Sequence, residues 1–102
     1  MIDLINKLFK RRQIDFKSLV REGALIIDVR TDAEYKSGHI KGSRNIPLDS
    51  LKGKLAEIKK MQKPIITVCR SGARSGMAKS VLSANGLEVY NGGPWNALQE
   101  KI

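Results

Sequence analysis

The strongest structural pattern in the chain is the stretch PIITVCRSGARSGMAKSVLSANG, residues 64–86. Its apolar, β-branched run over residues 65–68 predicts a buried strand that ends at Cys69, the only cysteine of the chain. The segment RSGARSG follows, and residues 75–84 are predicted to be helical, with Asn85-Gly86 as the stop. The thiol is therefore expected at the carboxyl end of a strand, directly before a helix opens.

Three features of this stretch favour thiolate over thiol at Cys69. Backbone N–H groups of the loop can converge on the sulfur, the helix dipole favours an anion, and Arg70 and Arg74 add positive charge. Such settings lower a cysteine pKa from about 8.5 to roughly 3.5–7.5. The alternative is a purely structural cysteine that is buried in the core at the end of a strand, since cysteine is among the most buried residue types. The arginines and glycines that follow the thiol favour a functional cysteine.

The composition indicates one small globular domain that spans residues 1–102. Of the 102 residues, 41% are hydrophobic, and one cysteine excludes an internal disulfide. One cysteine and one histidine argue against a structural zinc site. The sequence therefore predicts no metal and no cofactor.

The charge of the chain is strongly positive, at +9 from 19 basic and 10 acidic residues, which suits anionic ligands. Many lysines fall on predicted helix faces, as expected of a solvated surface. These are Lys52, Lys54, Lys59, Lys60 and Lys63. No basic run is interleaved with aromatic residues, so nucleic acid is not expected as a partner.

The first twelve residues, MIDLINKLFKRR, carry apolar side chains at helical spacing with basic residues after them. They predict an amphipathic basic helix or extension that packs on the domain. Asn6 and Lys7 interrupt the roughly 7–15 apolar residues that a secretory signal needs. We expect a cytoplasmic protein without stable membrane insertion, although a chain that had lost its signal would look the same.

The rest of the chain alternates predicted strands and helices. Strands are predicted at 13–14, 24–29, 39–45, 65–69 and 87–90, and helices at 16–23, 31–38, 48–61, 75–84 and 95–102, with a turn at 91–94. Thr31 and Glu34 have the spacing of a capping box. Continuous apolar strands imply an α/β fold with a mostly parallel, five-stranded central sheet and helices on both faces. Ligands bind beyond the carboxyl ends of such strands, where Cys69 and the Asp28-Val29-Arg30 turn both fall.

Four stretches together resemble the rhodanese family of sulfurtransferases. They are Asp28-Val29-Arg30, Glu34-Tyr35 with GHIKGSRNIP over 38–47, CRSGARS over 69–75, and VYNGG over 89–93 with Trp95. They stand in the order and spacing of the family across about residues 14–101. The resemblance implies a rhodanese-like fold in a free-standing, single-domain form.

The resemblance also implies an activity. Cys69 would take a sulfane sulfur from a small anionic donor such as thiosulfate and pass it, from a persulfide, to cyanide, a small thiol or a protein thiol. The substrate-binding loop would be Arg70, Ser71, Gly72, Ala73, Arg74 and Ser75, whose N–H groups cradle the persulfide and whose arginines hold the donor. Asp28 and Arg30 are expected to form an ion pair that supports the site. Contact of Arg30 with the substrate is the open alternative.

A phosphatase-like relative of the same fold is the first rival. The phosphate cradle of such enzymes has five residues between cysteine and arginine, whereas four separate Cys69 from Arg74 here. The loop also holds no acidic residue to protonate a leaving group. Both features disfavour phosphatase activity.

Two further hypotheses concern the role of the domain. A non-enzymatic adaptor or a redox- or persulfide-sensing module could use the same fold, but the retained cysteine and arginines favour an enzyme. The second hypothesis is sulfur delivery to a tRNA- or cofactor-modifying partner that docks on the basic surface.

Two ring-bearing residues near the motifs are expected to be structural. His39 should shape a turn, because a catalytic base needs hydrogen-bond reach to the reacting proton. Trp95, after Pro94, is expected in the core or at the rim of the site.

Overall fold

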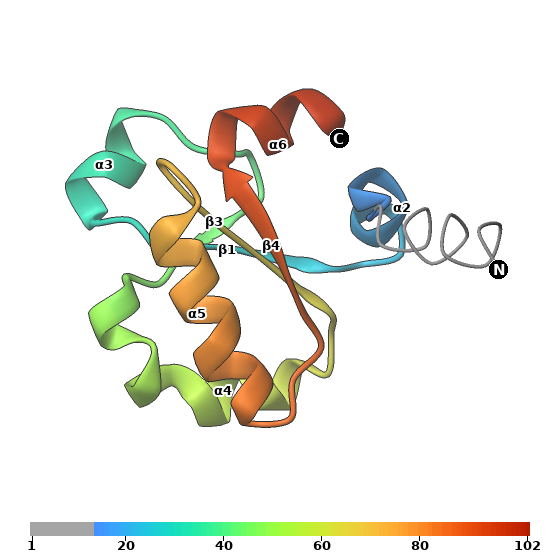
Figure 1. Cartoon of the computed structure of the whole chain (residues 1–102), viewed down its shortest axis with the longest axis vertical. Helices are drawn as coiled ribbons and strands as arrows, with labels where there is room; N and C mark the ends of the chain where they lie inside the picture. The colour runs from blue at the N-terminus through green and yellow to red at the C-terminus, as the bar shows by residue number, and fades with distance from the viewer. Residues whose placement is uncertain (1–13) are drawn as a thin grey trace, which may run out of the picture.

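The computed structural model describes residues 14–102, so the predicted N-terminal helix lies outside the described residues. Four strands form one fully parallel sheet in the order β2-β1-β3-β4, shown in Figure 1. In chain order the elements are α2 (Phe16–Arg21), β1 (Leu25–Asp28), α3 (Asp32–Ser37), β2 (Arg44–Asn45), the 3₁₀ turns η1 (Leu48–Ser50) and η2 (Lys52–Lys54), α4 (Leu55–Met61), β3 (Ile65–Cys69), α5 (Ala73–Ala84), β4 (Val89–Pro94) and α6 (Trp95–Lys101).

The α/β class and the parallel sheet are confirmed, but the number of strands differs from the prediction. The described residues contain four strands instead of five. The fifth was expected at residues 13–14. Ile14 is exposed and lies outside any strand, and Gln13 is not among the described residues. Ile14 stands between polar neighbours, and one apolar side chain buries too little surface to stabilise a separate strand.

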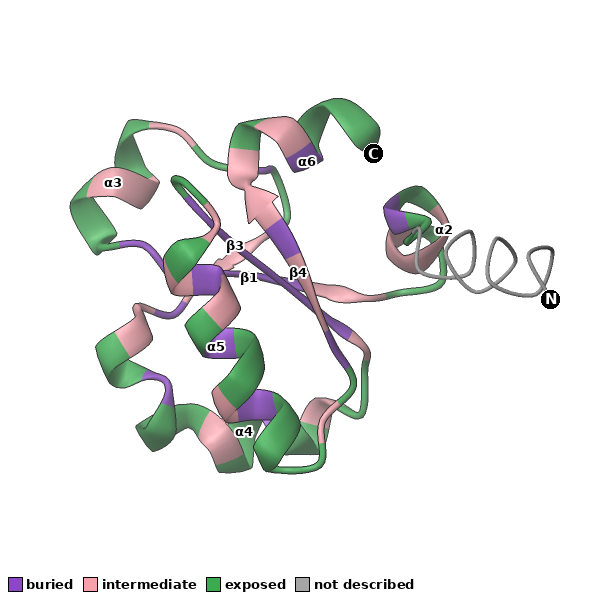
Figure 2. Cartoon of the chain, viewed as in Figure 1, coloured by how far each residue is buried: buried purple, intermediate pink, exposed green. Residues whose placement is uncertain are grey.

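Helices cover both faces of the sheet, as expected for parallel strands. Along β3, Ile65 and Cys69 face the cluster built with α4 and α5, whereas Ile66 and Val68 face the cluster built with α2 and α6. All five β3 residues are buried, which Figure 2 shows as an unbroken purple strand. Each fully buried isoleucine contributes about 1.5–3 kcal/mol. The core therefore anchors β3 rigidly and fixes where its last residue lies.

The capping box predicted for α3 is present. The Glu34 N–H donates to Thr31 Oγ1 at 3.2 Å, and the Thr31 N–H donates to Glu34 Oε1 at 3.0 Å. Because Thr31 follows closely on the end of β1, this cap starts α3 at the carboxyl edge of the sheet. It brings Glu34 to the same edge as Cys69.

Two elements differ from their predicted form. The helix expected at 48–61 is broken into η1, η2 and the short α4, and the backbone of Lys54 leaves helical geometry (φ −109°, ψ 1°) between the last two. The turn expected at 91–94 is strand: β4 pairs with β3 as far as Pro94 opposite Cys69. A register shift between Thr67 and Val68 absorbs the extra residue. The glycines mark a bulge in the strand instead of its end.

Gly92 lies at that bulge and has no room for a side chain. A Cβ there would fall 2.9 Å from both Ile66 Cγ2 and Val68 Cγ1. The glycine lets β4 stay against β3 while its backbone bends. The side chain of Asn91, directly before Gly92, reaches the start of α5 from this point. No helix within residues 14–102 is long and apolar enough to cross a membrane.

Candidate active site

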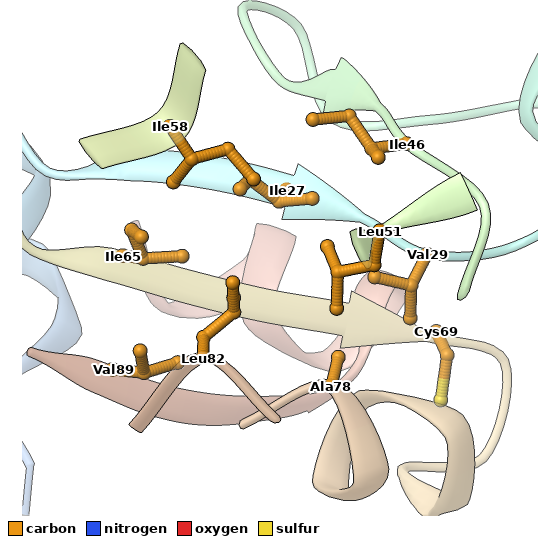
Figure 3. Packing of buried hydrophobic residues seen from close by; sticks show 10 residues of the cluster. All are labelled: Ile27, Val29, Ile46, Leu51, Ile58, Ile65, Cys69, Ala78, Leu82 and Val89. Carbon is orange, nitrogen blue, oxygen red and sulfur yellow. The ribbon is translucent and has the colours of Figure 1, made fainter. Parts of the chain in front are cut away.

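The site is built around Cys69, the last residue of β3, whose side chain is fully buried. Its sulfur points past the core side chains toward the loop and the first turn of α5, as Figure 3 shows. The Gly72 N–H donates to Sγ at 2.9 Å, and the Ser75 hydroxyl lies 3.3 Å from it. The predicted convergence of loop donors on a strand-end thiol is therefore present.

Gly72 is the residue before α5 and has a left-handed backbone, with φ +103°. A Cβ at Gly72 would meet nothing closer than 3.6 Å, at the Gly93 Cα. Conformation, not lack of space, therefore favours glycine at this position. The left-handed turn folds the loop back over β3 and directs the Gly72 N–H at the sulfur.

The pKa of the Cys69 thiol reflects two opposed effects. Burial raises it, and hydrogen bonds to the sulfur from the Ser75 hydroxyl and from the backbone of Ser75, Gly72 and Ser71 lower it. The hydrogen bonds win, and the pKa lies below the ordinary cysteine value. This direction agrees with the prediction, which rested on loop N–H groups, the helix dipole and the charges of Arg70 and Arg74 together.

The two loop arginines occupy different environments. Arg70 is exposed, whereas Arg74 is half-buried and forms a bidentate ion pair with Glu34, at 2.7 and 2.9 Å. This pair ties the start of α5 to the start of α3. Arg74 therefore stabilises the position of the loop through its ion pair with Glu34. No sequence pattern indicates this partner, which lies 40 residues away.

The pKa of Glu34 is held well below its usual range, first by the hydrogen bond from Arg74 and then by the Thr31 N–H. A depressed carboxyl pKa adds stability above the ordinary glutamate value of 4.5, and this stability is lost as the pH falls below that value. We expect Glu34→Gln to be less acid-sensitive than the parent. Urea midpoints at about pH 3 and about pH 7 measure this. A parent and variant with equal pH dependence would contradict the prediction.

The expected ion pair between Asp28 and Arg30 is confirmed, and both side chains are buried. The guanidinium bonds Asp28 through Nη2 at 2.7 Å and Nε at 2.9 Å, and also donates to the carbonyls of Glu34 and Gly38. It lies 4.8 Å from the centre of the half-buried Trp95 ring. These contacts hold Arg30 in the wall of the site and agree with a core or rim role for Trp95.

His39 contacts Tyr35 of the preceding helix α3. Its exposed ring stacks on Tyr35 at 3.7 Å and is bonded through Nδ1 to the Tyr35 carbonyl at 2.7 Å. These local contacts agree with the expected turn-shaping role.

Asn91 is a residue that the sequence reasoning missed. It follows Tyr90 in β4, beside the bulge, and its side chain contacts both Ser75 and the Gly72 carbonyl. It was expected in a turn, and no local pattern predicts that a residue 16 positions away bonds the active-site loop.

Two of the hollows in the described part of the chain lie at opposite ends of the sheet. One of about 360 Å³ lies beside Arg74 at the carboxyl end of β1; it is lined by Val29, Thr31, Pro47, Leu48, Asp49 and Arg74. A larger one, of about 450 Å³, lies beside Pro64 before β3 begins, at the opposite end of that strand from Cys69. Neither hollow is lined by Cys69, and the first shares Arg74 with the loop that follows the cysteine.

Comparison with known proteins adds a family and a set of relatives. A model of the rhodanese-like domain matches residues 12–99. The uncharacterized protein YqhL of Bacillus subtilis is 46% identical over 69 residues, covering 67% of this chain and 54% of the relative. Thiosulfate sulfurtransferase PspE of Escherichia coli is 38% identical over 69 residues, covering 66% of each. The match thus spans about half to two thirds of these relatives. A structure of a rhodanese with anions from E. coli superposes with a TM-score of 0.68 at 32% identity, covering 74% of this chain and 91% of that one.

Proposed function

The chain belongs to the rhodanese-like family, and we propose that it is a sulfurtransferase in which Cys69 carries the transferred sulfur as a persulfide. One observation carries the proposal: a buried strand-end sulfur receives the Gly72 N–H at 2.9 Å and has its pKa lowered by hydrogen bonds. A thiolate held in this way is a nucleophile at neutral pH. Relatives at 32–38% identity that are named thiosulfate sulfurtransferases support thiosulfate as a donor.

The reaction proceeds in two displacements. The Cys69 thiolate attacks the outer sulfur of thiosulfate, the bond between the two thiosulfate sulfurs breaks, and its electron pair leaves with sulfite. The negative charge then lies on the outer sulfur of the Cys69 persulfide. Cyanide or a thiolate acceptor attacks that sulfur in turn, and Cys69 is released as thiolate. Each step is a nucleophilic substitution at sulfur, and no external oxidant is needed.

The loop from Arg70 to Ser75 provides for the charge that moves during these steps. Its N–H groups are fixed in position by the start of α5 before the persulfide forms, so little reorganisation accompanies the reaction. Arg70 is exposed at the loop and attracts the anionic donor. Arg74 acts by bracing the loop through Glu34, since its guanidinium already holds that carboxylate.

The intact mass after incubation with thiosulfate tests the proposal. We expect the protein to gain one sulfur atom under non-reducing conditions, and the gain to be absent in Cys69→Ser and reversed in the parent by cyanide. Thiocyanate released in the second step should match the sulfur lost from the protein. If the parent gains no sulfur from thiosulfate or from other sulfane donors, the sulfurtransferase proposal fails.

A further inference from the structure

The Ser75 hydroxyl has one proton and three neighbours that can accept it. Its oxygen lies 3.3 Å from Cys69 Sγ, 3.1 Å from the Gly72 carbonyl and 2.7 Å from Asn91 Oδ1. Ser75 is fully buried, so water does not compete for this proton. A hydroxyl donates one hydrogen bond at a time. What Ser75 gives to one of these acceptors it withholds from the others.

The orientation of the Asn91 amide is fixed by its surroundings. The Gly93 N–H donates to Oδ1 at 2.9 Å, and Nδ2 donates to the Gly72 carbonyl at 3.2 Å. Rotating the amide by half a turn would oppose two donors at Gly93 and two acceptors at Gly72. Asn91 therefore presents an oxygen, not a nitrogen, to the Ser75 hydroxyl.

The fold makes room for Asn91 at this point. The bulge in β4 aims its side chain at the first turn of α5, where Gly76 follows Ser75. A Cβ on Gly76 would lie 3.3 Å from Asn91 Nδ2, which is tighter than ordinary contact. A glycine in the first turn of a helix costs stability relative to alanine, and here it leaves space for the amide.

We propose that Asn91 is a positioning residue for the reaction: its Oδ1 competes with Cys69 Sγ for the single Ser75 proton and so sets how much of the cysteine is thiolate. This inference rests on the proposed function for its catalytic meaning. When Sγ bears a charge, Ser75 donates to the sulfur. When Sγ is a thiol or carries the transferred sulfur, the charge is absent or lies on the outer sulfur, and Ser75 donates to Asn91.

The consequence is a balance between the two forms of the cysteine. Asn91 stabilises the states in which Sγ is uncharged, including the persulfide, whereas the Ser75 hydroxyl stabilises the free thiolate together with the Gly72 N–H. The charged groups that flank Cys69 are the Asp28–Arg30 pair on β1 and the Glu34–Arg74 pair between α3 and α5. Neither pair bonds Ser75 or Asn91, so changes at these two residues leave the flanking charges in place.

The pH dependence of alkylation of Cys69 by iodoacetamide measures the balance directly. We expect Ser75→Ala to raise the apparent thiol pKa by about one unit, because the thiolate loses a hydrogen-bond donor. We expect Asn91→Ala to lower it by about half a unit, because the Gly72 carbonyl is then the one remaining acceptor that competes with the sulfur for the proton. Asn91→Asp keeps an acceptor at this position and adds negative charge, so it should raise the pKa.

The double variant Ser75→Ala with Asn91→Ala separates this mechanism from simple loosening of the loop. Without the hydroxyl there is no proton to redirect, so Asn91→Ala should have no effect in the Ser75→Ala background. An equal shift in both backgrounds, or a raised or unchanged pKa in Asn91→Ala alone, would overturn the proposal. Alkylation needs no sulfur donor, so this result stands apart from the mass test of the sulfurtransferase activity.

Discussion

Replacement of Arg30 with methionine is expected to lower the free energy of unfolding by about 3–5 kcal/mol. Asp28 is fully buried at the end of β1, and Arg30 supplies it with two guanidinium hydrogen bonds of 2.7 and 2.9 Å. Methionine fills part of the same volume but leaves the carboxylate without its counter-charge. The loss in stability reflects an unpaired charge in the interior, and it is larger than the stability that the ion pair contributes to the intact protein.

Urea unfolding followed by circular dichroism measures this loss of stability, and two further variants serve as its controls. Arg44→Met removes the same group from an ion pair with Glu57 that is 40% and 47% exposed, and should cost less than about 1 kcal/mol. Asp28→Asn combined with Arg30→Met should recover most of the loss, because no charge is left behind. A loss in Arg30→Met no larger than that in Arg44→Met would show that Asp28 is not held by Arg30.

Sequence reasoning succeeded where the controlling interactions are local. The strand that ends at Cys69 and the capping box at Thr31 both depend on residues a few positions apart. The left-handed φ of +103° at Gly72 likewise reflects a local preference of glycine. Backbone preference and hydrophobic pattern act over such distances, so the sequence alone contains them.

Sequence reasoning failed where a contact spans the chain. The bulge at Gly92 depends on the side chains of β3, and a pair of glycines in isolation has the composition of a turn. Arg74 pairs with Glu34 on α3. The capping box already accounted for a glutamate at position 34, so nothing in the sequence indicated a second partner for it. Asn91 reaches Ser75 only because β4 continues past its predicted end. The sequence predicted that loop N–H groups, the helix dipole and the charges of Arg70 and Arg74 together favour the thiolate, whereas in the structure Arg74 is paired with Glu34 and hydrogen bonds lower the pKa of the thiol.

That distinction leads to the largest effect expected on turnover among variants that keep the cysteine. Gly72→Ala should lower the rate of sulfur transfer by about 10²–10³, as removal of one fixed donor from an anion hole does. An alanine disfavours the left-handed conformation by roughly 1–2 kcal/mol, so the turn shifts toward conformations that aim the N–H away from Cys69. The thiol pKa should rise with the loss of this donor.

Gly86→Ala is the matched control for this effect. Gly86 also has a left-handed backbone, with φ +83° and open space where a Cβ would lie, but it follows the far end of α5. Both variants should lose similar stability from backbone strain, and only Gly72→Ala should lose activity. Thiocyanate formation from thiosulfate and cyanide, measured beside urea midpoints, separates the two effects. Equal activity in the two variants would mean that the Gly72 N–H does not serve the transferred sulfur, and that the hydrogen bonds of Ser75 suffice to hold the thiolate.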